Sequence, residues 1–135
     1  MEAAGARLDF ERDLRFGWDM WTWARLQSGT AYFYYFMRQP PFPAGSIYHG
    51  WGASHFAELW YMSDHLDQEQ WSWGPEDRKL ADQMAAYWTN FVKNGDPNGR
   101  ALPRWPAFTS KGEVLRLDAP VSAGALPVFA EIDPA

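Results

Sequence analysis

The chain has 135 residues, 47% hydrophobic and 18% aromatic, which is enough apolar material for one modest domain with a core and excludes a disordered tail. A net charge of -5 argues against nucleic-acid binding as the main role. The absence of cysteine excludes disulfides, cysteine-ligated metals and a thiol nucleophile, and no stretch is apolar enough to span a membrane.

The first predicted element is a helix from about Asp9 to Gln27, because apolar residues recur at nearly helical spacing. These residues are Leu14, Trp18, Trp21 and Leu26. The opening stretch, Met1 to Asp13, is charged and lacks the apolar stretch of a signal peptide. Together with the lack of cysteine, this favours a cytoplasmic location.

An uninterrupted aromatic run from Ala31 to Met37 predicts a strand buried on both faces, at a central position in a covered sheet. Prolines and glycines between residues 38 and 50 then predict a long irregular loop. Leu59 to Leu66 is apolar enough to be a short helix or the wall of a pocket.

A second helix is predicted to begin at Gly74-Pro75, where proline suits the first turn and acidic residues face the positive end of the helix dipole. Its apolar face continues to Lys93, and Asn94-Gly95 ends it. Val114 to Leu117 alternates and predicts an exposed edge strand. Residues 119–135 are predicted to be a loop-like tail.

The candidate site is the stretch from Gly50 to Leu59, where His55 follows glycines and small residues. Imidazole has a pKa close to neutrality, so it can accept a proton and return it within one catalytic cycle. Ala53 and Ser54 leave room beside the ring. A lone histidine is more often structural than catalytic, so these residues alone leave both roles open.

Four stretches in this order resemble the C-terminal part of the type-B carboxylesterases, the α/β-hydrolases that include cholinesterases and bacterial para-nitrobenzyl esterases. They are FGWDMWTWAR at 16–25, YFYYF at 32–36, GASHFAEL at 52–59, and YWTNFVKNGDPN at 87–98 with LPRWP at 102–106. The similarity covers about residues 10–118. It implies an α/β fold within a single domain, 1–135: helix, buried central strand, histidine loop, long amphipathic helix and edge strand of an incomplete sheet.

The resemblance implies that His55 is the histidine of a catalytic triad in an ester hydrolase. In such an enzyme the imidazole takes the proton of a serine hydroxyl and later gives it to the departing alcohol. We expect Glu58 and Ser54 to support the histidine turn, and Trp51 and Phe56 to line the pocket for a small-molecule ester. The resemblance implies no cofactor and no metal.

The chain departs from the family in lacking a Gly-x-Ser-x-Gly turn and an oxyanion loop. Only 54 residues precede His55, too few for the nucleophile and the triad acid. We therefore expect the chain to be inactive alone. The strand over Ala31 to Met37 would lack a neighbour, which predicts pairing with the upstream part of the hydrolase or with a second copy.

Three alternatives remain open from the residues. A carbohydrate-binding module would use the many Trp and Tyr rings, but it predicts a β-sandwich. A metal site would draw on His49, His55, His65, Glu58 and Asp64. His55 and Glu58 are three residues apart and can share one helix face, but His49 and His65 lie in predicted loops without ligand-like spacing. A folded hydrolase remnant or interaction module without chemistry is the third.

Overall fold

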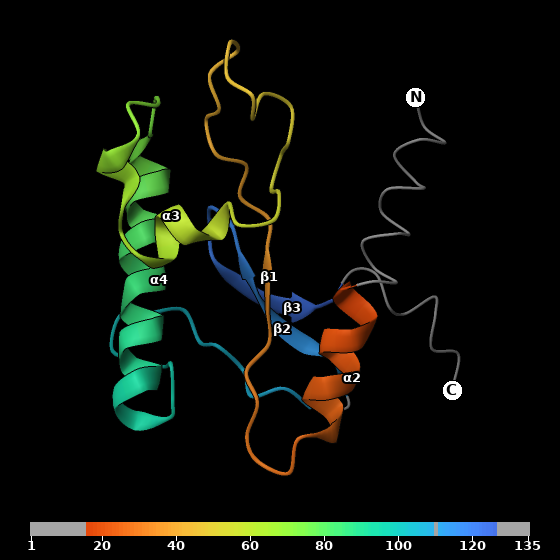
Figure 1. The fold of residues 1–135 in the computed structure, drawn as a ribbon. Helices are drawn as coiled ribbons and strands as arrows, with labels where there is room; N and C mark the ends of the chain where they lie inside the picture. The colour runs from red at the N-terminus through yellow and green to blue at the C-terminus, as the bar shows by residue number, and fades with distance from the viewer. Residues whose placement is uncertain (1–15, 110, 127–135) are drawn as a thin grey trace. The chain divides into compact units, whose positions relative to one another are not determined.

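The computed structural model describes residues 16–109 and 111–126, and it divides into two compact units. The first unit comprises residues 1–33, 106–114 and 124–135, and the second comprises residues 34–105 and 115–123. Figure 1 labels their helices and strands. The expectation of a single domain stays a prediction.

The first unit contains α2, Trp18–Leu26, in which no residue is buried. The rings of Trp18 and Trp21 lie 5.3 Å apart, and the guanidinium of Arg25 lies 4.4 Å from the centre of the Trp21 ring. The predicted helix is confirmed for this part, and its portion before Phe16 lies outside the described residues. The Phe108 N–H donates to the Ala31 carbonyl at 2.8 Å in the same unit.

The sheet has three strands in the order β1-β2-β3. They are β1, Tyr34–Phe36, β2, Glu113–Leu117, and β3, Ser122–Ala125. β1 and β2 are parallel, with Tyr34 opposite Leu115 and Phe36 opposite Leu117.

The positions of two strands differ from the prediction. The strand predicted at the exposed edge is β2, which is the middle strand, with Val114, Leu115 and Leu117 fully buried. Arg116 between two leucines suggested alternation with solvent, but the adjacent Val114 and Leu115 point to opposite faces and both are buried. β1, predicted as the central strand over Ala31 to Met37, is shorter, half-buried and at the end of the order.

The segment predicted as a loop-like tail contains β3. Its sequence, Ser-Ala-Gly-Ala, carries none of the β-branched or aromatic residues typical of strands. Its strand conformation comes from hydrogen bonding to its neighbour in the sheet, a long-range effect that local composition does not reveal.

The second unit is built on the long helix α4, Pro75–Asn94, as predicted. One face of α4 enters the core through Leu80, Ala81, Met84 and Tyr87. The short helix α3, Glu58–Met62, packs against it (Figure 1). Within the described ranges no helix is long and apolar enough to cross a membrane, and the cytoplasmic location stays a prediction.

The turn after α4 folds back onto the helix through side chains of the fourth motif. The Asn98 amide bridges both backbone groups of Trp105: its oxygen accepts the Trp105 N–H at 2.7 Å, and its nitrogen donates to the Trp105 carbonyl at 3.0 Å. The Tyr87 hydroxyl donates to the Pro103 carbonyl. The rings of Tyr34, Tyr87 and Trp88 all contact that of Trp105. These contacts form the part of the core near the end of α4.

Gly95 ends α4 in the left-handed region, with φ of 71°, and its N–H donates to the Phe91 carbonyl at 2.8 Å. We expect Gly95→Ala to lower the free energy of unfolding by about 1 kcal/mol, because a Cβ disfavours this conformation. Chemical denaturation provides the measurement. Gly29→Ala is the matched control, because a methyl group there also meets open space and Gly29 is not at positive φ. Equal losses for both variants would contradict the assignment of the cap.

Candidate functional site

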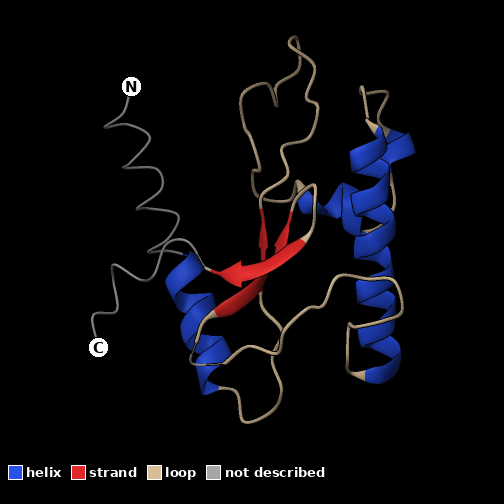
Figure 2. Cartoon of the chain, turned by 180° about the vertical axis from the view of Figure 1, so that it is seen from behind, coloured by secondary structure: helices blue, strands red, loops and turns tan. Residues whose placement is uncertain are grey.

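His55 lies in a tight turn directly before α3, at the end of a segment without helix or strand that follows β1 (Figure 2). The turn is closed by the Ala57 N–H, which donates to the Ser54 carbonyl at 3.0 Å. Gly50, Gly52 and Phe56 have φ values of 82°, 62° and 70°. A bulky residue such as Phe56 rarely adopts positive φ, and such positions cluster at functional sites.

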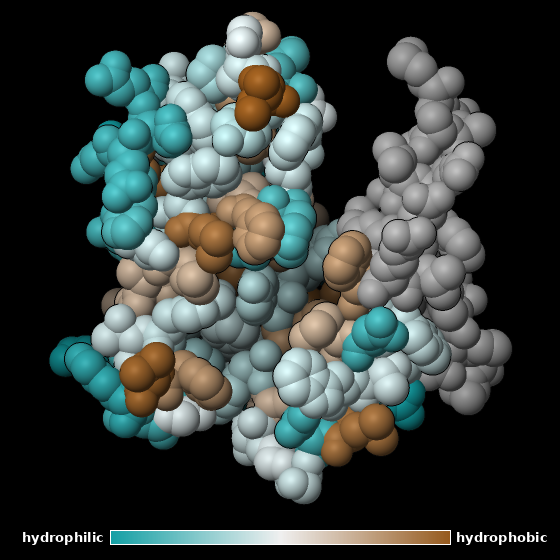
Figure 3. Space-filling model, in the orientation of Figure 1, coloured by the Kyte–Doolittle hydropathy of each residue, from teal (hydrophilic) through white to brown (hydrophobic). Residues whose placement is uncertain are grey.

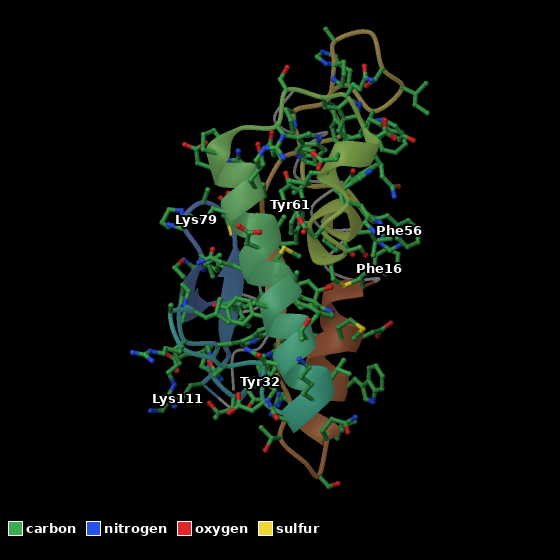
Figure 4. The ribbon with its side chains drawn as sticks, turned by 90° about the vertical axis from the view of Figure 1, so that its left-hand side faces the viewer. Phe16, Tyr32, Phe56, Tyr61, Lys79 and Lys111 are labelled. Atoms are coloured by element: carbon green, nitrogen blue, oxygen red, sulfur yellow. The ribbon has the colours of Figure 1, made fainter. Side chains whose placement is uncertain are left out.

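The imidazole of His55 is on the surface and rests on a neighbouring ring. The ring centres of His55 and Phe56 are 3.9 Å apart, and the ring planes are tilted by 34°. His55 is exposed, and Phe56 is 59% exposed. Figure 4 shows Phe56 directed outward beyond α3. The turn therefore presents the imidazole to whatever approaches this surface.

Four aromatic rings hold the segment that leads to His55. Every pair among them is in contact, with ring centres between 4.9 and 6.2 Å apart. We call this set the aromatic quartet: Phe42, Tyr48, Trp60 and Trp71. Because these rings come from the loop, from α3 and from the segment before α4, the quartet ties the three together. Trp51 joins its margin, 5.4 Å from Tyr48.

A buried carboxylate ties both ends of the same segment to α4. Asp77 is 2% exposed, and its Oδ1 accepts hydrogen bonds from the Arg38 Nε at 2.7 Å and from the Tyr61 hydroxyl at 2.9 Å. Its Oδ2 accepts the Gly74 N–H at 2.8 Å, which caps α4. Arg38 follows β1 and Tyr61 lies in α3, so one side chain joins three elements.

Burial and pairing act in opposite directions on this carboxyl group. Burial alone would raise the pKa of Asp77, but hydrogen bonds from Arg38, the Gly74 N–H and Tyr61 outweigh it and hold the pKa below its ordinary value. Burial, followed by the charge of Asp77, raises the pKa of Tyr61 well above that of a free phenol. The network is therefore a carboxylate bound by neutral and cationic donors at neutral pH.

The other predicted site residues surround His55 but are not shown to act with it. Ser54 closes the turn through its carbonyl, and Glu58 begins α3. Burial raises the pKa of Tyr34, and the charge of Glu58 raises it further. Trp51 is 55% exposed, and apolar groups reach the surface over the loop and α3 (Figure 3). The roles of Ser54, Glu58, Trp51 and Phe56 stay predictions.

A surface hollow of about 290 Å³ lies elsewhere, between α4 and the turn from β2 to β3. Its lining includes Glu76, Lys79 and Asp118, but neither Trp51 nor Phe56. Across residues 16–109 and 111–126, no group of three or more His, Asp and Glu side chains could hold a metal ion.

Sequence reasoning missed Arg38, Tyr61 and Asp77 as a unit. Asp77 was interpreted only as an acidic residue favourable to the helix N-terminus. A signal was nevertheless present: Arg38 is a single charge between an aromatic run and a proline-rich loop, a position from which a buried partner can be expected. Which carboxylate it pairs with depends on the fold.

Comparison with known proteins places the site in a family context. The model of the "Carboxylesterase family" matches residues 5–127. The "Carboxylesterase 5A" of Mus musculus is 30% identical over 115 residues, covering 74% of this chain and 18% of that protein. The chain thus spans less than a fifth of the curated relatives that it matches.

Solved structures agree on the fold. A structure titled "PNB ESTERASE" superimposes with a TM-score of 0.75 over 93% of this chain and 26% of that chain, at 24% identity. The carboxylesterase EST55 of Geobacillus stearothermophilus superimposes with a TM-score of 0.61 over 76% of this chain and 21% of that one, at 28% identity. The predicted class, an incomplete portion of an α/β-hydrolase fold, is confirmed.

Trp71 contacts all three other rings of the aromatic quartet. We expect Trp71→Ala to lower the free energy of unfolding by about 2 kcal/mol, less than for a fully buried Trp because Trp71 is half-buried. Trp23→Ala on α2 is the control, because Trp23 is exposed and should change stability little. Thermal and chemical unfolding of both variants would measure this, and a smaller loss for Trp71 than for Trp23 would refute the role of the quartet.

Asp77 gives the protein a specific response to acid. Because the pKa of Asp77 is lowered in the folded state, its contribution to the free energy of unfolding is complete above the ordinary Asp pKa of about 3.9. This contribution is lost as the pH falls through the folded pKa. We expect Asp77→Asn to lower the free energy of unfolding by about 2–3 kcal/mol at pH 7. The amide nitrogen of Asn is a donor, and it would replace a carboxylate oxygen that accepts a hydrogen bond from the Gly74 N–H or from Arg38. Below about pH 4 the difference in free energy of unfolding between Asp77→Asn and wild type should become smaller.

Urea unfolding between pH 2 and pH 7 measures this difference. Asp67→Asn is the control, because the ion pair between Asp67 and Arg78 is exposed at 3.1 Å and should matter little. A constant offset between wild type and Asp77→Asn at every pH would show that the charge of Asp77 is not what stabilises the fold.

Proposed function

The chain belongs to the carboxylesterase family, and from that premise we propose that it supplies the proton-carrying histidine, His55, of a serine ester hydrolase. The observation that carries this proposal is the exposed imidazole in a turn of unusual backbone conformation, within the part of the chain that the family model matches. The aromatic quartet and the hydrogen bonds of Asp77 support the proposal, because a proton carrier must be held in place while its ring stays accessible.

In the proposed reaction, the neutral imidazole accepts the proton of a serine hydroxyl as the serine oxygen attacks the ester carbonyl. The imidazolium then donates that proton to the departing alcohol. In the second half, the imidazole takes a proton from water as the water oxygen attacks the acyl-serine carbonyl. The imidazolium then returns that proton to the serine oxygen as the acyl–oxygen bond breaks and the acid is released. The serine, the oxyanion donors and the triad acid come from residues outside these 135, which contain no Gly-x-Ser-x-Gly turn.

The remaining roles follow from position. Ser54 and Glu58 support the turn on either side of His55, the first through its carbonyl and the second at the start of α3. Trp51 and Phe56 form the apolar margin of the site for a small-molecule ester. The partner is the upstream part of a hydrolase, with a second copy of this chain as the alternative.

Two other functions remain as alternatives. A carbohydrate-binding module would display its rings on a β-sandwich, whereas the described residues form helices and three short strands, and many of their rings contact one another. These observations favour the hydrolase. A remnant without chemistry would share this fold, so only activity measurements separate it from the proposal.

The first test uses the chain alone. With p-nitrophenyl acetate we expect no burst of p-nitrophenol and equal rates for wild type and His55→Ala, because no acyl-enzyme can form without the serine turn. A burst equal to the protein concentration that disappears in His55→Ala would contradict the expected inactivity.

The second test replaces the corresponding quarter of a PNB esterase with this chain. In the soluble hybrid we expect His55→Ala to lower kcat by a factor on the order of 10⁵ to 10⁶, as for other triad histidines. His49→Ala and His65→Ala are matched controls, because both histidines are exposed and lie outside helices and strands. A folded hybrid without activity would favour the remnant, and activity that survives His55→Ala would exclude the proposed role.

A further inference from the structure

The segment between Arg38 and Tyr61 is a closed loop whose two ends meet at one atom. The Arg38 Nε at its start and the Tyr61 hydroxyl at its end both donate to the Oδ1 of Asp77. The carboxylate itself is fixed, because its other oxygen accepts the Gly74 N–H at the start of α4. Figure 4 shows Tyr61 where α3 meets α4.

His55 lies near both ends of this closed loop. On one side, Gly52 lies close to the side chain of Gln39, the residue next to Arg38, because a methyl group placed on Gly52 would lie 3.8 Å from the Gln39 Cδ. On the other side, the Leu59 N–H donates to the Phe56 carbonyl at 3.1 Å, which joins the His55 turn to α3 and to Tyr61. The turn is therefore close to the start of the closed loop and hydrogen-bonded to its end, so we expect movement at these ends to reach it.

We propose that Asp77, with Arg38 and Tyr61, positions the catalytic imidazole by holding both ends of the segment that carries it. The three are positioning residues, because the hydrogen bonds of this network run among Arg38, Tyr61, Gly74 and Asp77 and none of them is to His55. The inference rests on the proposed function of His55 for its catalytic meaning. The mechanical part, that this carboxylate restrains the His55 turn, is tested without catalysis.

Two tyrosines allow a matched comparison. Tyr61 and Tyr87 are both fully buried, and each donates one hydroxyl hydrogen bond. Tyr61 holds the His55 segment, whereas Tyr87 bonds to Pro103 at the other end of α4. Removing either hydroxyl should lower global stability by a similar amount, but only Tyr61→Phe should loosen the His55 turn.

Native-state amide hydrogen exchange of the 135-residue chain measures this loosening at Trp51 and Ala57. Their N–H groups donate to the carbonyls of Tyr48 and Ser54, each at 3.0 Å. In Tyr61→Phe we expect both amides to exchange about fivefold faster, the loss of one ordinary hydrogen bond, and in Asp77→Asn about tenfold faster or more. In Tyr87→Phe they should stay within about twofold of wild type.

Unchanged exchange of both amides in Tyr61→Phe would overturn the inference, as would equal acceleration in Tyr61→Phe and Tyr87→Phe. Tyr61→Phe keeps the test decisive if Asp77→Asn does not fold. In the hybrid hydrolase, Tyr61→Phe should lower kcat severalfold at unchanged KM. If His55→Ala leaves the hybrid active, the proposed function fails. If His55→Ala inactivates it but exchange does not respond, only the positioning role fails.

Discussion

The second unit depends on one buried carboxylate that three donors share. Asp77 would destabilise the fold if it stood alone, because a desolvated charge without partners is costly. With Arg38, Tyr61 and the Gly74 N–H around it, the same group joins the end of β1, α3 and the start of α4. An irregular segment rich in proline and glycine thereby has fixed ends, and these ends bracket His55.

Contacts between aromatic rings hold the same segment in addition to the hydrogen bonds of Asp77. The aromatic quartet packs the middle of the segment against α3, and a second group of rings around Trp105 closes the core near the end of α4. The aromatic excess of the sequence therefore has a largely structural explanation. Flat rings in mutual contact can stabilise a loop that has few backbone hydrogen bonds of its own.

Local signals in the sequence predicted the parts of the fold that local chemistry decides. The prediction of α4 was correct from Pro75 to Gly95, because helix ends and apolar periodicity depend on residues that are close together in the sequence. The positions of β1 and β2 in the sheet and the existence of β3 depend on pairing between distant segments, and these were wrong or missed. For the same reason the sequence motif could suggest His55 as the site residue, a role that stays a proposal, whereas the pairing of Arg38 with Asp77 across 39 positions left no local signal of its partner.

We propose that His55 carries protons for a hydroxyl supplied from elsewhere in the hydrolase. Chemical rescue tests it most directly: p-nitrophenyl acetate hydrolysis by the hybrid hydrolase with His55→Ala, measured with and without added imidazole. If His55 has this role, imidazole restores part of the lost rate in His55→Ala and does not raise the rate of the hybrid that retains His55. A His55→Ala hybrid as active as its parent, with no response to imidazole, would contradict it.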